Sequence, residues 1–180
     1  MIVAFAGRRV DAPNAGQQRF PSTNVLKVRE RIRAQLAGFG GTTLVSSAAC
    51  GADLLALDVA GELGMRRVIV LPWSEAQFRK RSVVDRGAEW GEIFDRIVGD
   101  VDARDLRVLR RRGDDNAAYT ATNEAILDAA AAIARRSPGH DDVLAMVAWN
   151  GEPRGANDVT EAFMMAARER GMQVIEVSTV

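Results

Sequence analysis

The segment at residues 45–53 constrains the fold more than any other part of the chain. An apolar run at residues 42–45 breaks there into serine, alanine, cysteine and glycine, and a helical pattern follows at residues 52–63. A strand that ends in small residues just before a helix is typical of α/β proteins that hold phosphate, because backbone N–H groups can approach the ligand and the helix N-terminus adds partial positive charge. Glycine loops at residues 6–9 and 150–155 have the same character.

Strand-like and helix-like segments alternate along the whole chain. Their order predicts an α/β protein with a three-layer Rossmann-like fold, in which a mostly parallel central sheet is flanked by helices. We expect one domain over residues 1–180, and Ser22 or Thr23 as the cap of the first helix. Strands are predicted at residues 2–6, 42–46, 67–71, 105–109, 142–149 and 173–177, and helices at residues 23–36, 52–63, 74–80, 89–98, 116–134 and 157–170.

Composition excludes several classes of protein. The 24 basic and 24 acidic residues give no net charge, which argues against nucleic-acid binding. One cysteine allows no internal disulfide and fits a reducing cytoplasm. No apolar run approaches the roughly 20 residues of a membrane helix, and the first strand leaves no room for a signal peptide. We therefore expect a cytoplasmic protein without membrane contact.

The loops that follow the parallel strands converge at one edge of the sheet, where ligands bind in folds of this class. Glycines there allow close approach to phosphate, and arginine grips phosphate in a bidentate way. We expect ligand contacts from Gly7, Arg8, Arg9, Ser46, Ser47, Gly51, Asp53, Pro72, Trp73, Asn150, Gly151, Arg154, Gly155 and Asn157.

Several of these residues are open to two interpretations. Asp53 either accepts a hydrogen bond from a ribose hydroxyl or a neighbouring loop, or it simply complements the helix dipole. Trp73 either stacks on a base or packs under a loop. Gly51 either contacts a ligand or forms a tight turn. Tyr119 and Asn123 lie four residues apart on one helix and are expected to face the site.

Other reactive side chains are expected to be structural. Cys50 is interpreted as a small buried residue, because the lone histidine, His140, belongs to a solvated loop at the opposite edge of the sheet. Trp90 and Trp149 are expected in the core. No cluster of residues has metal-ligand spacing, so we expect neither a metal nor a cofactor.

The motifs resemble those of a known superfamily. Residues 45–53 resemble the Ser-Gly-x-Ala-x-Gly-x-Asp segment of the DprA/Smf proteins. The Gly-Arg turn after the first strand and the late glycine loop resemble the "lonely guy" (LOG) cytokinin-activating enzymes. With the Leu71-Pro72-Trp73 turn, residues 78–86 and the helix that carries Tyr119, the chain looks like a bacterial branch of the SLOG superfamily of Rossmann-like domains.

The resemblance implies a ligand that is a nucleotide or is derived from one. LOG enzymes are phosphoribohydrolases with a Pro-Gly-Gly-x-Gly-Thr-x-x-Glu motif, and the matching residues 153–161 lack the glycine pair and the threonine. Asp158 matches the position of the first catalytic glutamate of that motif, and Glu161 lies one helical turn further on. The leading hypothesis is therefore a ligand-sensing domain. The alternatives are a nucleoside 5′-monophosphate phosphoribohydrolase that uses Asp158 and Glu161, and a DprA-like protein that binds single-stranded DNA.

Two partners besides the small molecule are expected. The alanine-rich helix at residues 116–134 and the apolar residues Phe163, Met164 and Met165 predict a homodimer, as the resemblance to LOG proteins implies. A sensing role also implies an effector protein.

Overall fold

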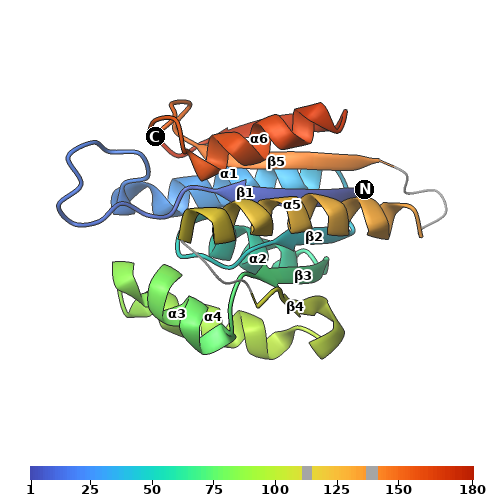
Figure 1. Ribbon diagram of the computed structural model, residues 1–180, viewed down its shortest axis with the longest axis horizontal. Coiled ribbons are helices and arrows are strands. Elements are labelled where there is room, and N and C mark those ends of the chain that lie inside the picture. The colour runs from blue at the N-terminus through green and yellow to red at the C-terminus, as the bar shows by residue number, and fades with distance from the viewer. Residues whose placement is uncertain (111–114, 137–141) are drawn as a thin grey trace.

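One parallel sheet forms the middle layer of the protein. The computed structural model describes residues 1–110, 115–136 and 142–180. Its strand order is β4-β3-β2-β1-β5-β6, and every pair of neighbouring strands is parallel (Figure 1). The predicted α/β fold is confirmed. The strands are β1 (Ile2–Gly7), β2 (Thr43–Ser46), β3 (Arg66–Leu71), β4 (Leu106–Val108), β5 (Val143–Trp149) and β6 (Gln173–Ser178).

Helices cover both faces of this sheet, close to the predicted boundaries. The predicted cap of the first helix is wrong, because Asn24 occupies that position and its side chain makes no capping hydrogen bond. Ser22 and Thr23 instead form a short 3₁₀ turn, which gives the backbone a different path into the helix. The α-helices are α1 (Val25–Gly38), α2 (Ala52–Glu62), α3 (Glu75–Ser82), α4 (Glu89–Asp100), α5 (Asp115–Ala134) and α6 (Val159–Glu169).

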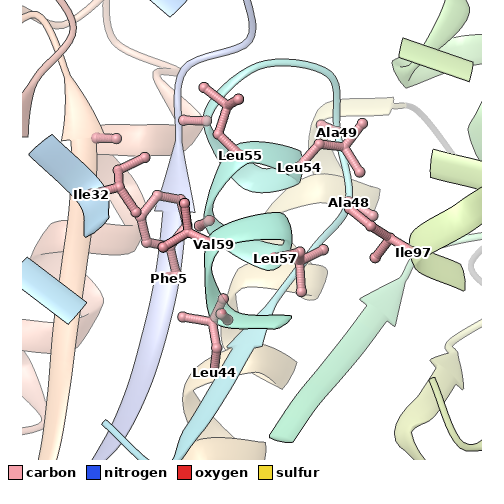
Figure 2. Close-up of a cluster of buried hydrophobic side chains, with 14 of the residues drawn as sticks. Phe5, Ile32, Leu44, Ala48, Ala49, Leu54, Leu55, Leu57, Val59 and Ile97 are labelled. Atoms are coloured by element: carbon pink, nitrogen blue, oxygen red, sulfur yellow. The ribbon is translucent and has the colours of Figure 1, made fainter. Parts of the chain in front are cut away.

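The apolar strands supply two cores. On β1, Val3 and Phe5 pack with α1 and α2, whereas Ala4 packs with α5 and α6 on the other face. This division follows from the alternation of side chains along a strand, and burial on both faces explains the continuous apolar runs. Figure 2 shows α2 between Phe5 and Ile32 on one side and Ile97 of α4 on the other.

The order of the strands reverses between β1 and β5. The chain runs outward from β1 to β4, and α5 then leads back across the sheet to β5 and β6 (Figure 1). Ligands of doubly wound sheets bind at the carboxyl ends of the strands near such a reversal. Gly7 ends β1 there, and a Cβ atom on it would lie 2.5 Å from the Cβ of Ala52 and 3.0 Å from that of Ala148. A glycine at this position lets α2 and β5 approach each other.

The residues interpreted as structural are buried wherever the structure describes them. Cys50, Trp90 and Trp149 are buried, which confirms those predictions. His140 lies outside the described residues. Phe163 and Met164, expected at a dimer contact, are buried in the core beneath α6, so only Met165 of that trio is exposed. None of the described helices combines the length and apolar character that crossing a bilayer requires.

The contact at Gly7 predicts a large difference between two glycine substitutions. Gly7→Ala should lower the free energy of unfolding by about 1–3 kcal/mol, because the added methyl group overpacks the junction of β1, α2 and β5. Gly16→Ala is the matched control, since nothing lies within 4 Å of a Cβ atom there. Urea denaturation of both variants measures the difference, and equal stabilities would contradict the assigned packing.

Candidate functional site

A cavity of about 190 Å³ lies at the carboxyl edge of the sheet, between the end of β1, the loop after β2 and the first half of α5. The first turn of α2, α3 and the start of α6 complete its walls. It is lined by Ala6, Gly7, Arg9, Ser47, Ala49, Asp53, Phe78, Tyr119, Thr122, Asn123, Ile126, Arg154, Val159 and Thr160.

The cavity gathers part of the predicted site. Five predicted ligand contacts line it, namely Gly7, Arg9, Ser47, Asp53 and Arg154. Tyr119 and Asn123 also face it, as the sequence predicts. The other predicted site residues lie outside its walls: Arg8, Ser46, Gly51, Pro72, Trp73, Asn150, Gly151, Gly155, Asn157, Asp158 and Glu161.

Asp53 is the acidic residue on the cavity wall, and the neighbouring loops fix its carboxyl group. Its Oδ1 accepts a hydrogen bond of 3.0 Å from the backbone N–H of Gly7, and its Oδ2 accepts one of 3.4 Å from that of Ala49. Burial raises the pKa of Asp53 to about 7, although the two backbone donors and the charge of Arg9 act in the opposite direction. Both protonation states are therefore populated near neutral pH.

Arg154 brings an unpaired positive charge to the cavity. Its backbone N–H donates a 2.7 Å hydrogen bond to Asp158, but its guanidinium makes neither a hydrogen bond nor an ion pair with any described residue. Arg154 is exposed by its accessible surface, but partial desolvation of its guanidinium and the nearby charge of Arg8 lower its pKa, and it remains cationic because arginine titrates far above neutrality. An anion could neutralise this group.

Arg9 is a second cation on the cavity wall, and it is already paired. Its guanidinium forms an ion pair with Asp85 and donates a 3.4 Å hydrogen bond to the sulfur of Cys50. Burial raises the pKa of the Cys50 thiol. Cys50 is thus a neutral packing residue at physiological pH, as expected.

Arg8 is buried, with 2% of its surface exposed, and it binds protein groups. Its guanidinium donates to the Asn150 side chain at 3.2 Å, to the Glu152 carbonyl at 2.6 Å and to Asp158 Oδ2 at 2.5 Å. The guanidinium carbon also lies 5.7 Å from the centre of the Trp149 ring. Arg8 therefore occupies the region between the ends of β1 and β5.

Asp158 is the partner of Arg8 and the cap of α6. Its Oδ1 accepts hydrogen bonds from the backbone N–H groups of Thr160 and Glu161, at 2.9 and 3.0 Å. Burial opposes ionisation of Asp158, but the backbone N–H groups of Glu161 and Arg154 and the guanidinium of Arg8 together lower its pKa. Both carboxylate oxygens are occupied by the protein itself.

Gly51 makes a close approach to protein backbone. Its φ is +97°, and a Cβ atom on it would lie 2.5 Å from the backbone nitrogen of Val10. The next amide, Ala52 N–H, donates to the Arg8 carbonyl at 3.0 Å. These contacts match the tight-turn interpretation and hold α2 against the loop after β1.

Trp73 packs behind the cavity wall. It is buried, its ring lies edge-on to Tyr119 with centroids 5.5 Å apart, and the Arg81 guanidinium lies 4.9 Å from its ring centre. Tyr119 is in turn hydrogen-bonded to Ser82 at 2.7 Å. Trp73 thus supports the side chain that lines the cavity, which matches its packing interpretation.

Sequence reasoning missed two residues that a helical pattern could have found. Thr122 and Ile126 share the face of α5 that presents Tyr119 and Asn123, since all four follow the spacing of one helical stripe. Asn123 donates a 2.8 Å hydrogen bond to the Val159 carbonyl, which joins α5 to the start of α6. Within the described ranges, no group of three or more histidine, cysteine or carboxylate side chains could hold a metal ion.

Comparison with known proteins finds a likeness among solved structures. Neither a protein-family model nor a curated protein matches the chain. Among solved structures, it is similar to DNA processing protein A (DprA) from Streptococcus pneumoniae, with a TM-score of 0.39 and 14% identity. The alignment covers 99% of this chain and 58% of that one, so the chain spans less than two thirds of its neighbour.

The Arg8–Asp158 pair predicts a strong, coupled effect on stability. Arg8→Met should lower the free energy of unfolding by about 3–5 kcal/mol, because Asp158 would remain buried without its counterion. Adding Asp158→Asn should recover part of that loss, since asparagine also caps a helix. Urea denaturation of the two single variants and the double variant measures the coupling. Strict additivity would contradict a direct interaction.

Asp53 predicts a specific pH dependence of stability. Its pKa of about 7 in the folded protein lies above the unfolded value of 3.8, so the folded state binds the extra proton between these two values. Wild type should therefore gain stability relative to Asp53→Asn as the pH falls through 7, by at most about 1.4 kcal/mol per pH unit. Denaturation of both proteins across this range measures the slope, and a constant difference would contradict the assignment.

Proposed function

We propose that the protein binds a nucleotide or a nucleotide-derived small molecule in the cavity at the carboxyl edge, and that it acts as a ligand-sensing domain. The observation that carries this proposal is the guanidinium of Arg154, which pairs with no described residue and lies on a wall that also presents Asp53, the already paired Arg9, neutral polar groups and apolar side chains. A guanidinium that is not paired within the protein can recognise an anion such as phosphate.

The remaining polar groups suit a hydroxyl-rich portion of the ligand. Ser47 and Thr160 bring hydroxyl groups, and Asn123 keeps its amide oxygen available as an acceptor while its nitrogen bonds to Val159. The volume of about 190 Å³ is below the roughly 300–1,000 Å³ typical of drug-sized ligand sites. We infer that a sugar-phosphate portion occupies the cavity and that the base lies at its mouth.

Membership of the SLOG superfamily is part of the proposal. It is supported by the order of the glycine loops along the chain, at residues 6–9, 46–51 and 150–155, each of which follows a parallel strand. A sensing role requires an effector that responds to the ligand, and we propose a protein partner for that purpose.

A nucleoside 5′-monophosphate phosphoribohydrolase is the second candidate, and Asp53 is the observation that favours it. A carboxyl group with a pKa near neutrality, on a cavity wall, is suited to proton transfer to or from a substrate. Asp158 offers less support for catalysis, because both of its oxygens accept hydrogen bonds from protein donors.

A binding panel tests the proposal. Isothermal titration calorimetry would compare nucleoside 5′-monophosphates, cyclic nucleotides and ADP-ribose, and mass spectrometry of the same mixtures would follow free base and ribose 5-phosphate. We expect one ligand class to bind and to be recovered unchanged. Arg154→Ala should weaken its binding by about tenfold or more, since a hydrogen bond to a charged group contributes roughly 1.5–3 kcal/mol.

Arg104→Ala is the matched control, because that arginine is exposed and, among the described residues, pairs with Asp102 at 3.2 Å, away from the cavity. Its affinity should equal that of wild type. Release of free base that Asp53→Asn abolishes would establish the hydrolase instead. Absence of binding across the panel, or equal affinity in the Arg154 variant, would refute the proposed site.

A further inference from the structure

The two oxygens of Asp53 differ in how strongly they are bound. Oδ1 accepts the 3.0 Å hydrogen bond from Gly7, whereas Oδ2 accepts only the long 3.4 Å bond from Ala49. No described cation forms an ion pair with either oxygen. Oδ2 is therefore the oxygen that can carry a proton, since a hydroxyl oxygen still accepts one weak hydrogen bond while it donates another.

The groups that face Asp53 from the surrounding elements leave its charge weakly compensated. Arg9, in the loop after β1, is the cation that acts on it, but that guanidinium already pairs with Asp85. The loop after β2 contributes Ser47 and Ala49, both neutral, and α3 contributes the apolar Phe78.

The walls formed by α5 and by the loop before α6 add one cation. Helix α5 contributes Tyr119 and Asn123, both neutral, and the loop before α6 contributes Arg154. Arg9 and Arg154 are thus the cations on the cavity wall, and Asp53 is the carboxylate.

The small size of the cavity brings any bound anion close to Asp53. Asp53 lines a cavity of about 190 Å³, so an anion bound there is partly buried beside it, and salt screens partly buried charges much less than exposed ones. Salt would therefore screen the two groups from each other only weakly. An ionised Asp53 would repel the anion, whereas a neutral one would donate a hydrogen bond to it.

We propose that Asp53 binds the anionic part of the ligand as a neutral carboxylic acid, donating a hydrogen bond from Oδ2, so that binding takes up one proton from solution. The inference rests on the proposed function and adds a specificity-determining residue to it. The proton comes from solvent, stays on Oδ2 while the ligand is bound, and returns to solvent when the ligand leaves.

Linkage fixes the direction of the pH dependence. The pKa of Asp53 is about 7 in the free protein, and an anion beside it favours the protonated form. Affinity should therefore be constant well below this pH and fall above it, by at most about tenfold per pH unit. Asp53→Asn, which is neutral at every pH, should show less than a twofold change over the same range.

The test uses ADP-ribose and sulfate as probes, because neither changes its charge over the pH range of interest. Calorimetry from about pH 6 to about pH 8.5, in buffers of different ionisation enthalpy, counts the protons taken up. Wild type should take up close to one proton at the upper end of this range, and Asp53→Asn none. Asp95→Asn is the control, because that exposed carboxylate pairs with Arg79 on another face, and it should behave as wild type.

The carboxyl carbon of Asp53 gives a second readout that needs no variant. Its ¹³C chemical shift, followed against pH with and without ADP-ribose, should report a pKa raised by about two and a half units or more in the complex, because uptake is close to one proton at the upper end of the range only if the complex titrates well above it. An unchanged or lowered pKa, or proton uptake equal in wild type and Asp53→Asn, would overturn the inference and leave the proposed function intact. If neither probe nor any nucleotide bound at any pH, both would fall.

Discussion

The ion pair between Arg8 and Asp158 is the interaction on which the arrangement of the carboxyl edge depends. It joins the residue that follows β1 to the cap of α6, across 150 positions of sequence. Burying two charges is costly unless every donor and acceptor is matched, and here Asn150, the Glu152 carbonyl and backbone amides complete the set. One pair thus fixes the ends of β1 and β5 and the start of α6.

This pair also determines where the cavity lies. Arg8 and Trp149 occupy the space between the ends of β1 and β5, so the open space is found beside β1 and β2, beneath the first half of α5. The same Asp158 holds the backbone of Arg154, whose guanidinium lines that cavity. Asp158, which pairs with Arg8, and Arg154, the candidate ligand-binding cation, therefore belong to the same loop. Loss of the Arg8–Asp158 pair would both destabilise the carboxyl edge of the sheet and displace Arg154.

The fold could be predicted from sequence because both faces of the sheet are buried, so strands such as Ile2–Gly7 are continuous apolar runs between amphipathic or alanine-rich helices. The side chains of the site were harder to assign. A glycine-arginine turn after a strand indicates an edge residue, but sequence does not reveal that Arg8 meets Asp158 while Arg154 meets no described partner. Likewise, Asp53 was open to several interpretations until its two backbone donors were known.

The central claim is that an anionic, nucleotide-derived ligand occupies the cavity between Arg154 and Asp53. A crystal structure of the protein grown with the ligand selected by the binding panel tests it most directly. The account predicts electron density for the ligand in this cavity, with its anionic group within hydrogen-bond distance of Arg154 and with the Arg8–Asp158 pair intact. Density for the ligand at another place on the sheet, or at the carboxyl edge only after Arg8 has left Asp158, would contradict it.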